Sequence, residues 1–218
     1  ARPPRMSDPL VIRPFLLPAR GVARVPGSKS VTNRALAIAA LADGETLLTG
    51  ALFSRDTRIL IAALRSLGFE VSDDEKARTI RVRGLGGKIP ARAARIHVGN
   101  AGTAMRPLTA ALALLAAAQG GCFELSGIPR MHERPIGDLV DALQQLGCPV
   151  DYLGQSGYPP LRVGDGATTA LQLDAPIRVR GDVSSQFLTA LLLALPLVAS
   201  RPIVIDVVGE LISKPYID

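Results

Sequence analysis

Three short stretches of this 218-residue chain place glycine or serine and polar side chains directly before an apolar segment. The first, residues 26–30 (PGSKS), precedes the apolar run 33–41. A helix that starts at such a turn offers free backbone N–H groups and a positive dipole end, which together bind anions. Lys29 adds a point charge, Ser30 a donor, and Arg34 a planar fork that can reach a carboxylate. A serine separates the glycine from the lysine, so the stretch does not match the P-loop of nucleoside triphosphatases.

The second stretch, residues 99–107 (GNAGTAMRP), repeats this device. Gly102 lets a ligand approach the backbone closely. Asn100 and Thr103 can either hydrogen-bond a ligand or cap the helix, and both interpretations stay open. Arg106 lies at the helix start, where the dipole disfavours a cation. It therefore needs an anionic partner, which is either a ligand or a buried carboxylate.

The third stretch, residues 184–186 (SSQ), offers two hydroxyls and an amide before the apolar run 187–195. This is more than a helix cap needs, and it suits a phosphate group. Further turns carry Arg134 before a helix-starting proline, the triplet 54–56 (SRD) and residues 213–216 (SKPY). The turns occupy equivalent places in a unit that the chain repeats, as described below. We therefore expect their anion-binding groups to lie close together at one end of the folded chain.

Four other reactive side chains have ordinary structural explanations. His132 can act as a general base, but a solvated loop histidine is the favoured interpretation, and His97 alternates with apolar residues in a strand. Cys122 and Cys148 lie in or beside apolar strand segments, so we expect buried inert thiols rather than nucleophiles.

The elements that must position the three stretches also repeat. Gly27, Gly99 and Gly181 lie 72 and 82 residues apart. Each stretch leads into an apolar helix and then a strand that ends at glycine. Amphipathic helices follow at 56–67 and 135–146, each ending at a glycine and leading to two short strands.

The repeating unit is therefore β-α-β-α-β-β, with boundaries at about 26–94, 95–176 and 177–218. The first helix of each unit is apolar on nearly every side, which predicts complete burial. We expect a mixed α/β (α+β) fold with the helices inside and the sheets outside. The third unit stops where its second helix should begin, so we expect this chain to be part of a longer protein, although a naturally short last unit is the alternative.

Composition narrows the function classes. The chain is 48% hydrophobic and 20% charged, which excludes a disordered protein, and its two cysteines exclude a disulfide scaffold. The net charge of +6 favours anionic partners. Small anionic metabolites fit better than nucleic acid, because aromatic residues are only 4% and no dense basic run occurs.

Two expectations concern location and the N-terminal region. No stretch reaches the ~20 apolar residues of a membrane span, and no secretion signal is evident, so we expect a cytosolic protein without a membrane or nucleic-acid partner. We treat residues 1–25 as a separate segment whose strand, 10–17, docks either on residues 26–218 or on an absent part of the protein.

Six strings along the chain resemble the enolpyruvyl transferase family, in the branch that acts on shikimate 3-phosphate. In order they are PGSKSVTNRALAIAALADG, GNAGTAMRPL, PRMHERPIGDLVDAL, YPPLRV, VSSQFLTALL and SKPYI. The resemblance implies two similar globular halves of three units each, with helix starts facing the cleft between them. The present chain would be the first half. It further implies transfer of the enolpyruvyl group of phosphoenolpyruvate to the 5-hydroxyl of shikimate 3-phosphate, with release of phosphate and without a metal or organic cofactor.

The same resemblance implies a role for each matching residue. Lys29 would serve both substrates as the catalytic lysine of this half, and Gln186 would lie between them. The shikimate 3-phosphate group comprises Lys29, Ser30, Arg34, Ser184, Ser185, Gln186, Ser213 and Tyr216. The phosphoenolpyruvate group comprises Lys29, Asn100, Gly102, Thr103, Arg134 and Gln186.

The chain departs from the family pattern in two ways. The turn 54–56 is less acidic than usual, which puts any polar contact it makes in doubt. The acid and base carboxylates of the family belong to the absent half, so we expect this chain alone to be an inactive monomer that needs that half as partner.

Two alternatives remain. One is a non-catalytic anion-binding module. The other is the sister branch that modifies a UDP-amino sugar, which carries a reactive cysteine in a loop of its first half, whereas Cys122 and Cys148 here lie in strand contexts.

Overall fold

The structure is a computed structural model that describes residues 11, 13–18, 20–214 and 217. Its first part pairs two helices with an antiparallel sheet of order β1-β3-β2. Asp43 lies opposite Leu85 at one end of the β1–β3 ladder, and Thr49 lies opposite Thr79 at the other. The elements are α1 (Lys29–Leu41), β1 (Asp43–Thr49), α2 (Arg55–Ser66), β2 (Val71–Asp74) and β3 (Thr79–Leu85).

The second part has a four-stranded sheet of order β4-β5-β7-β6. β4 runs parallel to β5, and the other two pairings are antiparallel. The parallel pair is joined through a long helix, as a parallel connection requires. The elements are β4 (Ala93–His97), α3 (Gly102–Gln119), β5 (Cys122–Ser126), α4 (Pro129–His132), α5 (Gly137–Gln145), β6 (Val150–Tyr152) and β7 (Leu161–Val163).

The third part is a parallel strand pair connected through one helix. Ile177 lies opposite Ile205, and Arg180 lies opposite Val208. The elements are β8 (Ile177–Arg180), α6 (Ser185–Ala194), a 3-10 turn (Leu195–Leu197) and β9 (Ile205–Val208).

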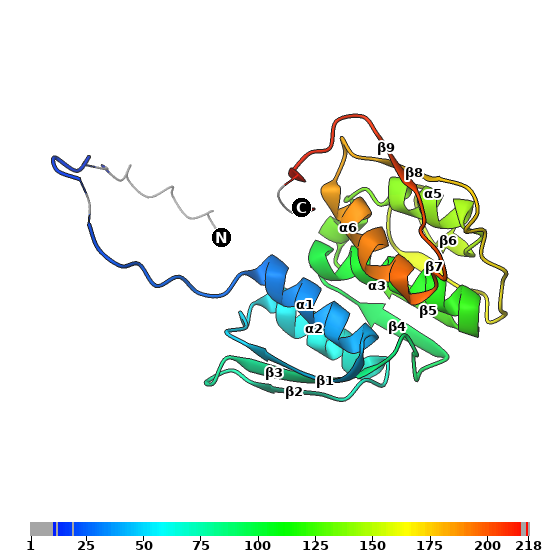
Figure 1. The fold of residues 1–218 in the computed structure, drawn as a ribbon, viewed down its shortest axis with the longest axis horizontal. Helices are drawn as coiled ribbons and strands as arrows, with labels where there is room; N and C mark the ends of the chain where they lie inside the picture. The colour runs from blue at the N-terminus through cyan, green and yellow to red at the C-terminus, as the bar shows by residue number, and fades with distance from the viewer. Residues whose placement is uncertain (1–10, 12, 19, 215–216, 218) are drawn as a thin grey trace, which may run out of the picture.

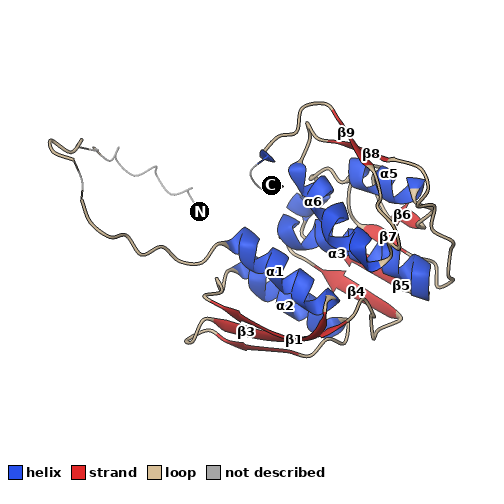
Figure 2. Ribbon diagram, in the orientation of Figure 1, coloured by secondary structure: helices blue, strands red, loops and turns tan. Residues whose placement is uncertain are grey.

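The core lies between the helices and the inner faces of the sheets. α3 is buried along most of its length and packs against α1 and α6. Figures 1 and 2 show the helices gathered in the middle of the molecule, with the β1-β3-β2 sheet on one side of α1 and α2. The starts of α1, α3 and α6 lie at the same side of the body (Figure 1). None of the helices in the described part of the chain combines the length and apolar character that crossing a membrane requires.

Glycines end the two amphipathic helices as the sequence predicts. Gly68 follows α2 with φ +92°, and Gly147 follows α5 with φ +83°. The N–H of Phe69 donates to the carbonyl of Leu64 at 3.0 Å, and the N–H of Cys148 donates to that of Leu143 at 3.0 Å. These bonds are those of the Schellman motif, which satisfies the last carbonyls of a helix.

Several predicted boundaries are wrong. The apolar helices begin at Lys29, Gly102 and Ser185, two to four residues before the predicted starts. Helix α5 begins at Gly137 rather than at residue 135, and a short helix that the sequence did not predict, α4, precedes it at Pro129–His132. Capping explains part of the shift: Ser28 Oγ accepts from the N–H of Val31 at 3.4 Å and extends α1.

The predicted strands at the N-terminal side are not seen. Among residues 11, 13–18 and 20–28 no strand forms, so the segment before α1 lacks its expected first strand. These described residues run away from the body (Figure 1), and Phe15 and Leu16 are exposed. The described part of the strand predicted at 10–17 is not paired with any other strand of this chain. Its pairing with another part of the protein stays a prediction.

Candidate functional site

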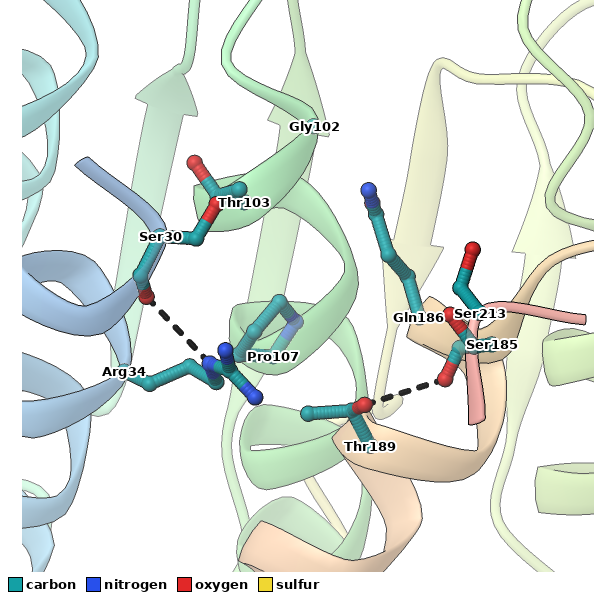
Figure 3. A pocket seen from close by; sticks show the side chains of 9 residues that line it. All are labelled: Ser30, Arg34, Gly102, Thr103, Pro107, Ser185, Gln186, Thr189 and Ser213. Atoms are coloured by element: carbon teal, nitrogen blue, oxygen red, sulfur yellow. Dashed lines mark hydrogen bonds between the residues drawn. The ribbon is translucent and has the colours of Figure 1, made fainter. Parts of the chain in front are cut away.

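The starts of α1, α3 and α6 enclose a pocket of about 240 Å³. Figure 3 shows side chains from these three helices, together with one from the C-terminal segment, turned toward the same space. The lining residues are Ser30, Arg34, Gly102, Thr103, Pro107, Ser185, Gln186, Thr189 and Ser213.

Helix α1 contributes a hydroxyl and a guanidinium. Arg34 Nε donates to the carbonyl of Ser30 at 3.3 Å, which keeps both residues at the pocket wall (Figure 3). Lys29 lies next to this wall without lining it, and its Nζ forms a 2.9 Å ion pair with Asp56 Oδ2 on α2. The Asp56 side chain is only 20% exposed. The turn 54–56 thus makes a polar contact with the predicted catalytic lysine, despite its unusual sequence.

Helix α3 begins at the pocket, and no side chain caps its first turn. Thr103 Oγ1 accepts from Asn33 Nδ2 at 2.8 Å, which joins the start of α3 to α1. Asn100 accepts from Arg134 Nη1 through its backbone oxygen at 3.0 Å and its Oδ1 at 3.5 Å. Asn100 and Thr103 therefore do not cap α3, and the first-turn N–H groups have no side-chain acceptor.

Arg106 reaches back beneath the start of α3. The residue is 4% exposed, and its Nη2 donates to the carbonyl of Pro135 at 3.0 Å. Burial, followed by the positive charge of Arg134, lowers the pKa of Arg106 to about 10. None of the described residues provides a carboxylate to pair with it.

The two serines at the start of α6 have different roles: Ser184 caps the helix and Ser185 lines the pocket. Ser184 Oγ accepts from the N–H of Gln186 at 3.2 Å and caps the helix. Ser185 and Gln186 line the pocket, and Thr189 Oγ1 donates to the carbonyl of Ser185 at 3.0 Å (Figure 3). Ser213 reaches the pocket from the C-terminal segment with φ +54°, a left-handed backbone that is uncommon outside glycine.

Unpartnered buried polar atoms collect on these same helices. Within the described part of the chain they are Asn33 Oδ1 on α1, Arg106 Nε and Nη1 on α3, and Gln186 Oε1 on α6. A buried donor or acceptor without a partner costs about 1–3 kcal/mol, so native proteins rarely keep them without a reason. Their concentration at one end of the molecule marks this end as a candidate ligand site.

The structure brings most of the predicted site residues together. Seven of them line the pocket: Ser30, Arg34, Gly102, Thr103, Ser185, Gln186 and Ser213. Lys29, Ser184, Asn100 and Arg134 adjoin it through sequence neighbours or hydrogen bonds without lining it. Tyr216 lies outside the described residues.

Three residues at or beside the pocket are not among the predicted site residues: Thr189, and Pro107 and Asp56, which lie in the stretches 99–107 and 54–56 without an assigned role. Thr189 lies one turn after Ser185, so i, i+4 spacing together with its polarity in an apolar helix is a usable signal. Pro107 and Asp56 carry no such signal, because their roles arise from contacts between helices.

The histidines and cysteines do not form a reactive cluster at the pocket, but two of the expectations about their burial need correction. His132 is half-buried rather than solvated, with Nε2 3.1 Å from Ser126 Oγ and accepting from the N–H of Gly127 at 3.4 Å. Cys148 is buried, and burial raises the pKa of its thiol to about 12, which makes it unreactive. Cys122 is half-buried rather than fully buried. The described residues contain no group of three or more His, Cys, Asp or Glu arranged to hold a metal ion.

Comparison with known proteins adds an independent observation. A family described as EPSP synthase (3-phosphoshikimate 1-carboxyvinyltransferase) matches residues 18–218. A 3-phosphoshikimate 1-carboxyvinyltransferase of Ralstonia nicotianae is 58% identical over 202 residues, which cover 92% of this chain and 45% of the relative. One of Bordetella petrii is 58% identical over 215 residues, covering 97% and 46%.

A solved structure agrees with the fold. EPSP synthase from Acinetobacter baumannii is 29% identical with a TM-score of 0.64, over 80% of this chain and 38% of that chain. The present chain therefore spans less than half the length of these curated relatives.

Proposed function

Because this chain belongs to the EPSP synthase family, we propose that it supplies the shikimate 3-phosphate side of a 3-phosphoshikimate 1-carboxyvinyltransferase. The reaction moves the enolpyruvyl group of phosphoenolpyruvate to the 5-hydroxyl of shikimate 3-phosphate and releases phosphate. The observation that carries the proposal is the pocket in which three helix starts meet, lined by the residues that the family resemblance singles out.

The pocket chemistry suits a phosphorylated, carboxylated ring. The fork of Arg34 pairs with a carboxylate, with Ser30 beside it as a donor. Ser185 and Ser213 donate hydroxyl groups to the 3-phosphate, and Ser184 joins them from the cap of α6. Tyr216 lies outside the described residues, and the family resemblance implies that it would pack beside the ring. These are the roles that we propose for the side of the pocket formed by α1 and α6.

The start of α3 would receive phosphoenolpyruvate. The positive end of the helix dipole and the guanidinium of Arg134 would face the anion, and Gly102 leaves room for it. The N–H groups of Gly102 and Ala104 already donate to the carbonyls of Asn100 and Ala101. Asn100 holds Arg134 by hydrogen bonds, and Thr103 is held by Asn33. Gln186 lies between the two substrates.

Lys29 would complete the site from the α1 side. Its ammonium can contact both substrates if it leaves, or shares, its ion pair with Asp56. We propose Asp56 as the residue that keeps Lys29 in place before the substrates bind.

The arrangement of the elements supports a three-unit architecture. Apart from the short helix α4, the elements of 93–163 follow the order β-α-β-α-β-β, and the parts on either side share shorter versions of it. We propose that residues 26–218 form one globular half of a two-half enzyme. The second half would close over the pocket, exclude water and provide the acid and base groups.

A reconstitution assay tests this function. The chain would be mixed with the remaining, non-matching part of the Ralstonia nicotianae relative, and phosphate release from both substrates would be measured. We expect turnover in the mixture and none from either part alone. Lys29→Met should abolish it, whereas Lys76→Met, an exposed charge in the β2–β3 turn, should leave it unchanged.

If the two parts associate in size-exclusion chromatography without producing turnover, a non-catalytic anion-binding module is the better description. The sister reaction on a UDP-amino sugar predicts turnover with that sugar instead of shikimate 3-phosphate.

A further inference from the structure

The guanidinium of Arg106 is a buried charge that makes one hydrogen bond and no ion pair with the described residues. The residue is 4% exposed, and its Nε and Nη1 have no hydrogen-bond partner in the described part of the chain. Its Nη2 donates to the carbonyl of Pro135, and its Cζ lies 5.8 Å from the ring centre of Phe187. A neutral side chain of similar shape would fill this space at lower cost, because burying an unpaired ion costs several kcal/mol.

The direction of the side chain places this charge beneath the start of α3. Long side chains in helices point back toward the N-terminus. A Cβ added to Gly102 would lie 2.4 Å from Arg106 Nη1 and 2.7 Å from Arg134 Nη2. Two guanidiniums therefore flank one backbone position at the positive end of the helix dipole.

No negative charge balances this cluster within the described residues. Arg134 hydrogen-bonds to Asn100, an uncharged residue, and neither arginine forms an ion pair. Burial of Arg106, followed by the positive charge of Arg134, lowers its pKa to about 10, so the group stays protonated at neutral pH. The site keeps two like charges and a positive dipole end together without a counterion.

We propose that Arg106 is a positioning residue that provides an uncompensated positive charge behind Gly102, for a phosphate-bearing anion bound at Arg134 and the first turn of α3. The unpartnered Nε and Nη1 are covered by protein, so Arg106 acts on that anion through the electric field rather than by contact. The idea rests on the proposed function and adds a residue to the phosphoenolpyruvate side of its site.

A purely structural role of Arg106 predicts the opposite effect of its removal on stability. If Arg106 served to anchor α3 to Pro135, its removal would lower stability. If it serves the anion, removal of a buried unpaired charge leaves the empty protein at least as stable and weakens anion binding.

The test uses this chain with inorganic phosphate as the probe, at about pH 8, where phosphate is mainly a dianion. Phosphate affinity would be measured by NMR titration, and thermal unfolding without phosphate by circular dichroism. The variants are Arg106→Met and Arg106→Lys, with Arg83→Met as the control that removes an exposed charge on β3.

We expect Arg106→Met to weaken phosphate binding about tenfold without lowering the unfolding temperature. Arg106→Lys keeps the charge and should bind phosphate within about threefold of the parent, and Arg83→Met should match the parent. Unchanged phosphate affinity in Arg106→Met overturns the proposal. So does failure of that variant to fold, a lower unfolding temperature, or the absence of saturable phosphate binding by the parent chain.

These outcomes are separate from the proposed function. The phosphate titration requires neither turnover nor shikimate 3-phosphate. A failure of the Arg106 proposal can therefore be told apart from a failure of the proposed function.

Discussion

Gly102 lies at the start of α3, where the guanidiniums of Arg106 and Arg134 flank the backbone. It has no unusual backbone angle, so its value lies in the space that it leaves. An added methyl group would overlap the Arg106 and Arg134 side chains at 2.4 and 2.7 Å. The Arg134 side chain can move aside because the residue is only half-buried. The clash is therefore expected to disturb the site more than the fold.

The Gly102→Ala substitution should weaken phosphoenolpyruvate binding about tenfold, because it displaces a charge-assisted donor worth about 1.5–3 kcal/mol. Isothermal titration calorimetry with phosphoenolpyruvate measures this directly. Gly154→Ala is the matched control, since its added Cβ would meet Pro160 Cδ at an ordinary 3.5 Å. Equal affinity in Gly102→Ala and the parent would show that the anion does not bind at this helix start.

Cys148 gives a prediction about pH and stability. Its thiol has a pKa of about 12 in the folded protein, raised by burial from 9.0. Above pH 9 the unfolded chain releases this proton while the folded protein retains it, so the free energy of unfolding falls as pH rises toward 12.

Between pH 8 and 10 the loss due to Cys148 should be about 1.4 kcal/mol. Urea unfolding of the parent and of Cys148→Ala at both pH values isolates this contribution, because the variant lacks the thiol. If the two proteins show the same pH dependence, Cys148 is not buried as the structure has it.

At the scale of elements, the helix starts combine capping and ligand binding. Ser184 caps α6 and neighbours the pocket, whereas Ser54 caps α2 by accepting from the N–H of Thr57 at 3.2 Å and lies outside the pocket lining. Each serine caps its helix by accepting from a backbone N–H of the first turn, so a comparison of the two separates helix stability from ligand binding.

Ser184→Ala and Ser54→Ala should each lower the free energy of unfolding by about 1 kcal/mol, the usual worth of an N-cap hydroxyl. Only Ser184→Ala should also weaken binding of shikimate 3-phosphate. Chemical denaturation and ligand titration of both variants provide the two readouts. A loss of affinity in Ser54→Ala as well would mean that helix stability alone controls binding.

Much of this arrangement could be predicted from sequence. The 3.6-residue periodicity in 56–67 and the glycines at 68 and 147 correctly indicated α2, α5 and their ends. The polar stretches before apolar runs correctly indicated the three helix starts that form the pocket.

Other features depend on contacts that the sequence does not encode locally. Ser184 caps α6 and Ser185 lines the pocket because the hydroxyl of Ser184 is the one that accepts from the backbone of α6. The partner of Lys29 is on α2, and the short helix α4 lies in a segment where the sequence predicts no helix. The expected strands before α1 are absent from the described residues, because no neighbouring strand lies there to pair with them.

At the scale of the whole molecule, three helices from distant parts of the chain direct their positive ends to one pocket. Residues 30, 102 and 185 come from three successive parts of the sequence and line the same space. The helices are held there by burial, since α3 packs between α1 and α6. A ligand that binds the pocket must therefore affect all three helix starts at once.

An NMR titration of the chain with shikimate 3-phosphate measures this directly. The account predicts that backbone amide signals of Ser30, Gly102 and Ser185 shift together and follow one saturation curve. Shifts confined to one helix start, or different saturation curves for the three, would contradict a shared site.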